Sequence, residues 1–386
     1  MALRARVPLA WKNLTHEPRR LALAVGGIAF AVLLMFAQLG FRGALLDSTV
    51  ELPRKLNADL VILSRGKYAL NVIETFPRSR LYQALGCEGV ATAYPLYIES
   101  RQSMWQDPVT GQTNPIRVLA FEPEDPVLLM PEVEAQAKKL VAAQTALADV
   151  LSKSDYGVMR TGLETELSAK KIRIVGTFTL GTDFANDGTL IMSADNYCRY
   201  FYPTRGRQAL ERVDLGLVKL AEGADATSVR NAIAASLPDD VMVMLKADYI
   251  AAELKFWQSS TPIGFVFGFG TAMGFVVGVI ICYQILYSDI SDHMAEFATL
   301  KAMGYRNSYF IRVVLQGSLL VSFLGFVPGL AVSYALYRGL ALATGLLLHL
   351  SFGRCVFVLT LTIIMCVVSG SLTVRKVLNA DPAELF

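Results

Sequence analysis

The chain has 386 residues, of which 18% are charged and 53% hydrophobic, with a formal net charge of +3 and a mean hydropathy of +0.42. Soluble domains carry about 25% charged residues, so a membrane must take up part of this apolar excess. The small net charge and the lack of a basic tract exclude a nucleic-acid-binding protein. The 5 cysteines are too few for a disulfide scaffold, and the glycines have no collagen period.

Four charge-free runs are each long enough to cross a bilayer, which takes about 20 apolar residues. They are residues 21–41, 262–287, 313–337 and 355–374. The first run exceeds the apolar core of a signal peptide and has no convincing cleavage site, so we interpret it as an uncleaved anchor. A fifth apolar stretch, 339–350, is too short to span and predicts an external interfacial or re-entrant segment over 338–354.

Basic residues near the first run set the expected orientation. Five precede it: Arg4, Arg6, Lys12, Arg19 and Arg20. They place the N-terminus in the cytoplasm, and four spans return the C-terminus to the same side. The predicted parts outside the spans are a cytoplasmic amphipathic segment 1–20, a periplasmic domain 42–261, a cytoplasmic coupling loop 288–312 and a cytoplasmic tail 375–386.

The long segment between the first two spans mixes strand and helix patterns, which predicts an α/β or α+β domain. Short strands are expected at 58–63, 116–121, 172–180, 189–192, 214–220 and 241–246. Helices are expected at 79–85, 132–150, 194–201 and 225–237. Two further helices, 43–56 and 248–258, are interpreted as stalks; Ile250, Leu254 and Trp257 share one face of the second. Paired stalks either carry motion between this domain and the bilayer or act as rigid spacers.

The sequence contains no catalytic constellation. It lacks the G-x-x-x-x-G-K-[ST] loop, so the chain is not expected to bind ATP itself. The three histidines, His16, His293 and His349, lie in separate segments that flank the membrane, and therefore do not form a zinc triad. We expect no cofactor and no metal on this chain.

Two pairs of residues in the external domain leave alternatives open. Asp183 and Asp187 lie in the sequence GTDFANDG and could approach a cation, although a turn rich in Gly, Asn and Asp explains them more simply. Cys87 and Cys198 could form a disulfide if their Cα atoms lie within about 7 Å of each other.

The second span carries a stripe of small residues on one face. Its members are Gly264, Gly268, Thr271, Gly274 and Gly278. Such a stripe lets two helix backbones approach closely, either within the chain or, as we favour, between two subunits. The spans contain no Asp, Glu, Lys or Arg, which argues against an ion-coupled transporter or a channel.

The loop between the second and third spans predicts a short amphipathic helix at the membrane surface. Met294, Phe297 and Leu300 form a stripe at i, i+3 and i+6, and Gly304 supplies a helix stop. The helix either seals the membrane interface or docks into a partner as a coupling helix.

The same loop carries a family resemblance. The sequence EFATLKAMG at 296–304 resembles the E-x-x-T-L-[RK]-A-[ML]-G pattern of FtsX/MacB-type permeases of ABC transporters, and the order of spans and external domain is also theirs. Further segments resemble the DevC subgroup: VPLAW at 7–11, GIAFAVLLMF at 27–36, GTDFANDG at 181–188 and DPAELF at 381–386. The resemblance extends from one end of the chain to the other.

This resemblance implies a non-catalytic permease subunit of a MacB-like tripartite exporter in the bacterial inner membrane. A separate cytoplasmic ATPase (DevA-like), which binds ATP-Mg, would dock on the coupling helix. The implied ATPase-coupling residues are Met294, Glu296, Phe297, Thr299, Leu300, Lys301 and Gly304. Two permease chains, a periplasmic membrane-fusion adaptor (DevB-like) and a TolC-like outer-membrane channel would complete the pump. Its substrate would be lipid-like or otherwise amphiphilic, such as a glycolipid, in contact with membrane lipid.

Three other readings are weaker. An FtsX-like regulator of a periplasmic cell-wall hydrolase would have a smaller external domain. A sensory receptor would need a cytoplasmic signalling domain, and only short loops and tails are expected inside. A membrane-embedded enzyme would need catalytic groups that the sequence lacks.

Overall fold

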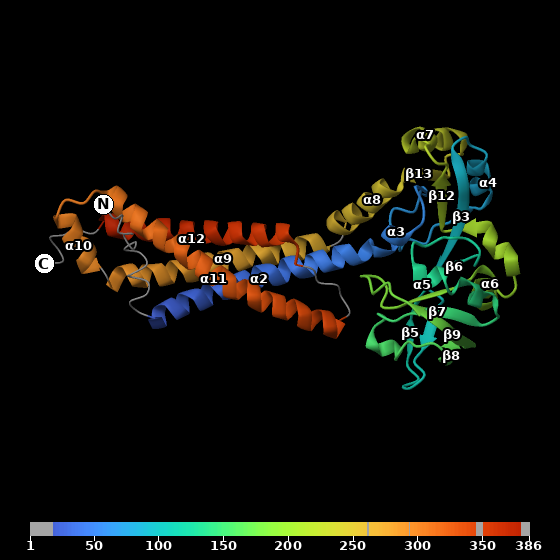
Figure 1. The fold of residues 1–386 in the computed structure, drawn as a ribbon, viewed down its shortest axis with the longest axis horizontal. Coiled ribbons are helices and arrows are strands. Elements are labelled where there is room, and N and C mark those ends of the chain that lie inside the picture. The colour runs from blue at the N-terminus through green and yellow to red at the C-terminus, as the bar shows by residue number, and fades with distance from the viewer. Residues whose placement is uncertain (1–17, 261, 293, 345–349, 380–386) are drawn as a thin grey trace, which may run out of the picture. The chain divides into compact units, whose positions relative to one another are not determined.

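The computed structural model describes residues 18–260, 262–292, 294–344 and 350–379. Residues 1–17 of the predicted segment 1–20 lie outside the described residues, as do His293, His349 and the terminal motif 381–386. The chain divides into two compact units. We call them the helical unit, made of Met1–Gly43, Ile263–Ala341 and Leu348–Phe386, and the sheet unit, made of Ala44–Pro262 with Leu342–Leu347 (Figure 1).

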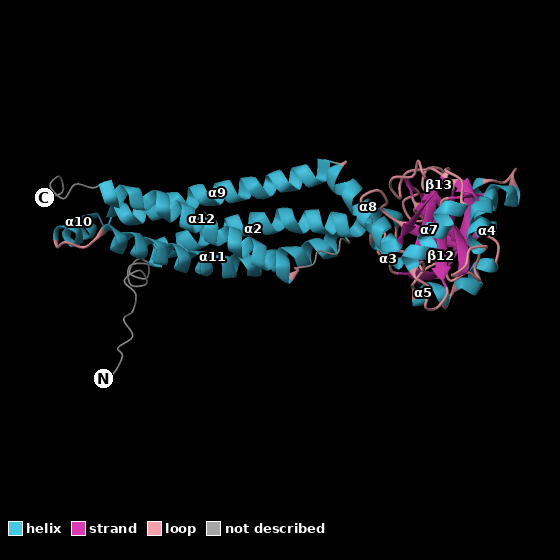
Figure 2. Cartoon of the chain, turned by 90° about the horizontal axis from the view of Figure 1, so that it is seen from above, coloured by secondary structure: helices cyan, strands magenta, loops and turns pink. Residues whose placement is uncertain are grey.

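The helical unit contains four long helices that lie side by side (Figures 1 and 2). They are α2 (Pro18–Thr49), α9 (Pro262–Asp292), α11 (Asn307–Thr344) and α12 (Phe352–Asn379). Each is long and apolar enough to cross a membrane, with mean hydropathies of 2.2, 2.3, 2.0 and 2.4 over its best window. They include the four predicted runs and extend beyond them. Residues 338–344 continue α11 rather than forming a separate interfacial segment.

The core of the helical unit forms around α2. Ile28, Val32, Met35 and Phe36 of α2 are buried against side chains from the other three long helices, among them Leu286, Val321 and Met365. Many large apolar side chains on the outside of the bundle are exposed, including Phe265, Phe323 and Phe357. An apolar exterior around a packed interior is the surface expected of helices in lipid.

Two glycines on α11 bring that helix close to α2. A Cβ atom added at Gly325 would lie 2.6 Å from the Cβ of Ile28, and one added at Gly329 would lie 2.8 Å from the Cβ of Val32. These residues are four positions apart, as in other small-residue helix contacts. The sequence analysis did not single them out.

The sheet unit is built on an eleven-stranded mixed sheet with the order β13-β1-β12-β3-β6-β10-β7-β9-β8-β4-β5. The strands in chain order are β1 (Leu60–Ser64), β3 (Val90–Glu99), β4 (Met104–Gln106), β5 (Thr113–Pro115), β6 (Arg117–Phe121), β7 (Thr145–Asp149), β8 (Glu164–Leu167), β9 (Lys170–Phe178), β10 (Thr189–Ser193), β12 (Leu215–Leu220) and β13 (Val241–Leu245). The β6–β10 and β7–β9 pairs are parallel. Two short strands, β2 (Phe76–Pro77) and β11 (Arg212–Val213), pair separately. All six predicted strands are confirmed.

Three of the predicted helices in this unit are confirmed as α4 (Ser79–Leu85), α6 (Ala194–Phe201) and α7 (Ala226–Ser236). Local capping explains two of them: Ser193 accepts a hydrogen bond from the backbone N–H of Asn196, and Asp225 accepts one from that of Ser228. The 3-10 helices are η1 (Ala137–Val141), η2 (Ser154–Tyr156) and η3 (Gly206–Glu211).

The predicted helix over 132–150 is wrong. The segment instead forms α5 (Pro131–Glu134), η1 and the buried strand β7. Helical geometry ends after Val141, because Ala142 is extended, and Gln144 then takes a left-handed conformation with φ of 62° just before β7. Parallel pairing with β9 and antiparallel pairing with β10 then fix the strand, and both partners are distant in sequence.

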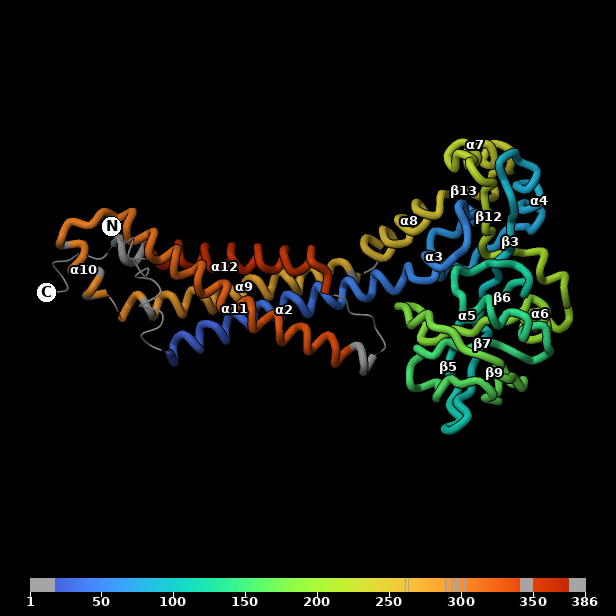
Figure 3. The backbone as a smooth tube through the Cα atoms, viewed as in Figure 1, coloured from blue at the N-terminus to red at the C-terminus, as the bar shows by residue number. Residues whose placement is uncertain are grey.

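The predicted stalks are helical. The first comprises the end of α2 and α3 (Glu51–Lys55), and the second is α8 (Lys246–Ser259), which follows β13 directly (Figure 3). The predicted apolar face of α8 is confirmed at Trp257 and wrong at its other two positions. Tyr249, Glu253 and Trp257 are buried, whereas Ile250 and Leu254 are half-buried. The face of α8 that packs against the rest of the sheet unit therefore carries the carboxyl group of Glu253.

Candidate functional site

The predicted helix of the loop between α9 and α11 is present as α10 (Met294–Ala302). Gly304 ends it with φ of +90°. The backbone N–H of Tyr305 donates to the carbonyl of Leu300 at 3.2 Å, and that of Gly304 donates to Lys301 at 3.0 Å. These two bonds form a Schellman motif, in which the left-handed position favours glycine.

The side chains of α10 divide into an inner and an outer set. Met294 and Leu300 are half-buried and pack against Ile290 of α9, Phe310 and Val314 of α11, and Val374 of α12. Glu296 and Thr299 are exposed, and Lys301 is half-buried. The side chain of Phe297 lies outside the described residues. Met294 and Leu300 therefore seal α10 onto its own bundle, and Glu296 and Thr299 face outward.

The structure adds two exposed apolar residues to this outer surface. Met303 is 62% exposed and Tyr305 is 46% exposed, on either side of Gly304. Single exposed apolar side chains are common, but two beside an exposed helix end make a plausible contact surface. We call Glu296, Thr299, Met303 and Tyr305 the outer surface of α10.

Replacing Gly304 by alanine is expected to destabilise the end of α10 by about 1 kcal/mol, because a Cβ is unfavourable in the left-handed region. Hydrogen exchange of the peptide amides in 299–305 should become about fivefold faster. Gly317 on α11 is the matched control, since a Cβ there would meet nothing within 4 Å and its φ is not positive. Unchanged exchange in Gly304→Ala would contradict the motif.

The predicted small-residue stripe on α9 has two different environments. A Cβ at Gly278 would lie 2.8 Å from the Cβ of Ala31 on α2 and 2.1 Å from the sulfur of Met365 on α12, and Gly274 also faces α2. Thr271 is buried. A Cβ at Gly268 would meet no described atom within 4 Å, and Gly264 is half-buried. The stripe thus packs within the chain over its later half.

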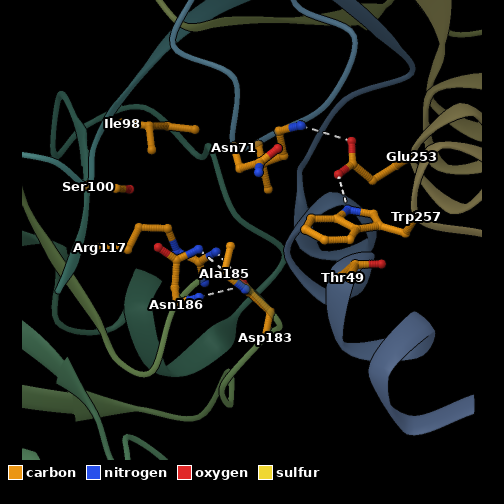
Figure 4. A pocket seen from close by; sticks show the side chains of 11 residues that line it. Thr49, Asn71, Ile98, Ser100, Arg117, Asp183, Ala185, Asn186, Glu253 and Trp257 are labelled. Atoms are coloured by element: carbon orange, nitrogen blue, oxygen red, sulfur yellow. Dashed lines mark hydrogen bonds and ion pairs between the residues drawn. The ribbon is translucent and has the colours of Figure 1, made fainter. Parts of the chain in front are cut away.

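The sheet unit contains a small cavity where α8 and the end of α2 meet the sheet and its loops (Figure 4). Its volume is about 20 Å³, room for about one water molecule. The lining residues are Thr49, Leu70, Asn71, Ile98, Ser100, Arg117, Asp183, Ala185, Asn186, Glu253 and Trp257.

A buried ion pair forms one wall of this cavity. Arg117, at the start of β6, is 2% exposed; it pairs with Asp183 and donates to the Thr189 hydroxyl at 2.9 Å. Its Nε has no hydrogen-bond partner among the described residues. Asp183 also accepts hydrogen bonds from the backbone N–H groups of Ala185 and Asn186, both at 2.9 Å.

The structure shows the contacts of the acidic pair and of the cysteine pair for which the sequence left alternatives open. Asp187 pairs with Lys153 at 2.6 Å, so the two acidic residues of GTDFANDG face cations of the protein. No cluster of three metal-ligating side chains occurs within the described ranges. Cys87 and Cys198 are free thiols, and the Cys87 sulfur instead lies 3.3 Å from the hydroxyl of Ser236.

Comparison with known proteins identifies the later part of the chain. Residues 268–382 match the family model described as FtsX-like permease C-terminal, so this region, which includes α10, α11 and α12, is similar to FtsX-like permeases. The resemblance of the loop motif is confirmed at this level. No curated protein matches the sequence.

Two solved structures are similar to part of the chain. One is the periplasmic region of MacB from Actinobacillus actinomycetemcomitans, with 12% identity and a TM-score of 0.35, covering 50% of this chain and 92% of that one. The other is the extracellular domain of the noncanonic ABC-type transporter YknZ from Gram-positive bacteria, with 8% identity and a TM-score of 0.31, covering 48% of this chain and 98% of that one.

Proposed function

From the FtsX-like permease domain at 268–382 we propose that this chain is the permease subunit of a MacB-like tripartite ABC exporter of the DevC type. The observation that carries the proposal is the match of this domain together with a capped helix, α10, between two candidate membrane spans. The proposal places the protein in the bacterial inner membrane with both termini in the cytoplasm.

Energy enters the proposed exporter through a partner. The sequence has no P-loop, so ATP-Mg binds to a separate DevA-like ATPase that docks on the outer surface of α10. Met294 and Leu300 connect this helix to the ends of α9, α11 and α12, so a force on α10 is passed to the bundle. Helix α2 then provides a continuous connection, because it runs from Pro18 in the helical unit to Thr49 in the sheet unit.

The other proposed partners act on the sheet unit. A DevB-like adaptor and a TolC-like channel receive a lipid-like or amphiphilic substrate, such as a glycolipid, and a second copy of the chain completes the permease. Four helices with many exposed apolar side chains support contact with membrane lipid. The second candidate, an FtsX-like regulator of a cell-wall hydrolase, shares the permease domain but exports nothing.

Charge changes on the outer surface of α10 are expected to weaken binding of the ATPase. Met303→Asp and Glu296→Lys alter exposed side chains and leave the inner contacts in place. If these residues are central to the interface, each costs about 2 kcal/mol, or about a 30-fold loss of affinity. Co-purification and ATPase stimulation in nanodiscs measure this, with the exposed Glu222→Lys in the sheet unit as control. Normal complex formation by both variants would remove the coupling role of α10.

Export is tested separately from docking. With a catalytically inactive ATPase partner, release of the amphiphile from cells should stop, since the permease has no energy source of its own. Undiminished release would reject the exporter. If no amphiphile is released by the wild type and cell-wall hydrolysis follows ATPase activity, the regulator is the correct function.

A further inference from the structure

Helix α8 is attached to the sheet unit by a carboxyl group on its buried face. Glu253 is 1% exposed. Its Oε2 accepts a hydrogen bond from the backbone N–H of Leu70 at 2.9 Å, and its Oε1 accepts one from the indole Nε1 of Trp257 at 2.8 Å (Figure 4). Leu70 lies in the 65–75 loop between β1 and β2. The first bond therefore joins the helix to a loop that is distant in sequence.

The rest of this attachment is aromatic. The rings of Trp257 and Phe184 meet edge-on, with 5.1 Å between their centroids, and the ring centroids of Phe256 and Tyr68 are 5.3 Å apart. The cavity lined by Glu253, Trp257 and Arg117 separates these contacts from the ion pair on the far wall.

Glu253 is buried without a directly paired cation among the described residues. The nearest positive group is Lys67, whose ammonium donates to the carbonyl of Val72 at 2.6 Å and lies 3.8 Å from Asp214. Glu74 adds negative charge in the same loop, and Asp183 is already paired with Arg117. Tyr249, one turn earlier on α8, is buried, and its hydroxyl has no hydrogen-bond partner in the part of the chain that the structure describes. A buried carboxylate in such surroundings costs more free energy than a neutral carboxyl group.

We propose that Glu253 is a proton-operated latch, which holds α8 against the 65–75 loop when it is protonated and releases the helix when it ionises. On release the proton passes to bulk water, and the carboxylate becomes hydrated. The latch is a property of the sheet unit alone and does not depend on the proposed export function.

The sign of the pH dependence follows from the burial of Glu253. Desolvation raises the pKa of Glu253, while the N–H groups of Trp257 and Leu70 and the charge of Lys67 oppose the rise. The attached state therefore binds the proton more tightly than the released state. Attachment is strongest below the ordinary pKa of glutamate and weakens as pH rises through the raised value.

One other group near the latch titrates in the same direction. Burial raises the pKa of Asp214 to about 6, against the opposing charge of Lys67. Asp214 accepts a hydrogen bond from the backbone N–H of Ile98 and lies 3.8 Å from the Lys67 ammonium, and neither partner belongs to α8. A pH effect that belongs to Asp214 would survive the removal of the Glu253 carboxyl group, so the two groups can be separated.

Hydrogen exchange of the full chain in lipid nanodiscs tests the latch. After correction for intrinsic rates, protection of the Leu70 amide should fall as pH rises from the ordinary to the raised pKa of Glu253, by about tenfold for each pKa unit between the attached and released states. Glu253→Gln, which stays neutral, should remain protected across this range. Asp248→Asn, an exposed residue of the same helix, should behave like the wild type. A wild type without pH dependence, or the same dependence in Glu253→Gln, would overturn the proposal.

A second variant covers the case in which Glu253→Gln does not fold. Trp257→Phe keeps an aromatic ring against Phe184 but removes the Nε1–H group. In the wild type this group donates a hydrogen bond that stabilises the ionised carboxylate of Glu253. The loss of protection at Leu70 should therefore move to higher pH. An unchanged midpoint in this variant would also reject the latch.

Discussion

Asp183→Asn is expected to lower the free energy of unfolding of the sheet unit by about 3–5 kcal/mol, because it leaves the buried guanidinium of Arg117 without its counter-charge. The Arg117 side chain is only 2% exposed and that of Asp183 only 10%, so bulk water does not solvate the guanidinium in place of the lost carboxylate. The Nε of Arg117 is already without a partner among the described residues, which leaves little capacity to absorb the change.

Thermal unfolding of the purified chain measures this effect. For a domain of this size each kcal/mol shifts the midpoint by about 2–4 °C, so a fall of about 6–20 °C is expected. Asp187→Asn in the same loop is the matched control. Its pair with Lys153 has side chains 45% and 46% exposed, and such surface pairs contribute less than about 1 kcal/mol. Equal shifts for the two variants would contradict the assigned roles.

Replacing both Arg117 and Asp183 by neutral residues tests whether the unpaired buried charge causes the loss of stability. Arg117→Met combined with Asp183→Asn removes the charge from both sides of the pair. Buried pairs replaced by neutral groups of similar size often lose little stability, so the double variant should recover much of the loss seen in Asp183→Asn. If it does not, other interactions of the Arg117 side chain, such as its hydrogen bond to the Thr189 hydroxyl, carry the stability instead.

Local signals explain which elements could be predicted from the sequence. The four spans follow from charge-free runs, whose length and composition are sufficient evidence by themselves. Helices α6 and α7 begin directly after Ser193 and Asp225, whose side chains cap them. Gly304 ends α10 for an equally local reason, because its backbone conformation favours a residue without a Cβ.

Long-range pairing explains what could not be predicted. The segment 145–149 has the composition of a helix, and becomes β7 only because β9 and β10 take up its backbone hydrogen bonds. Strands β3 and β8 were also missed. The Ala91 to Pro95 part of β3 lacks a clean alternation of apolar and polar residues, and β8 contains two glutamates that argue against a strand.

The candidate sites show the same difference between local signals and long-range contacts. The pattern at 296–304 predicted α10 and its end, but not which of its residues face outward, since Met294 and Leu300 are held by side chains from three other helices. Glu253 and Arg117 gave no signal, because a charged residue in a sequence indicates exposure unless its partner is known. Their partners, Leu70 and Asp183, are far away along the chain.

Gly278→Val is expected to destabilise the helical unit by about 1–3 kcal/mol, because the new side chain overlaps both α2 and α12. Met365 can move its flexible sulfur, but the Cβ of Ala31, 2.8 Å from the Cβ position at Gly278, cannot turn away. Thermal unfolding in detergent should show an earlier transition of the helical unit, and the same is expected for Gly329→Val against Val32. An unchanged transition in both variants would show that these helices do not pack as described.

Gly268→Val is the informative partner of that experiment. No described atom lies within 4 Å of a Cβ at this position, so the single chain should keep its stability. We favour a contact between two subunits for the first half of the stripe. In that case the branched side chain separates two helix backbones that need close approach. Light scattering should then show loss of the dimer, while thermal unfolding is unchanged. A variant that is both stable and still dimeric would place the subunit contact elsewhere. The two glycines thus separate packing within the chain from packing between chains, although both belong to one stripe in the sequence.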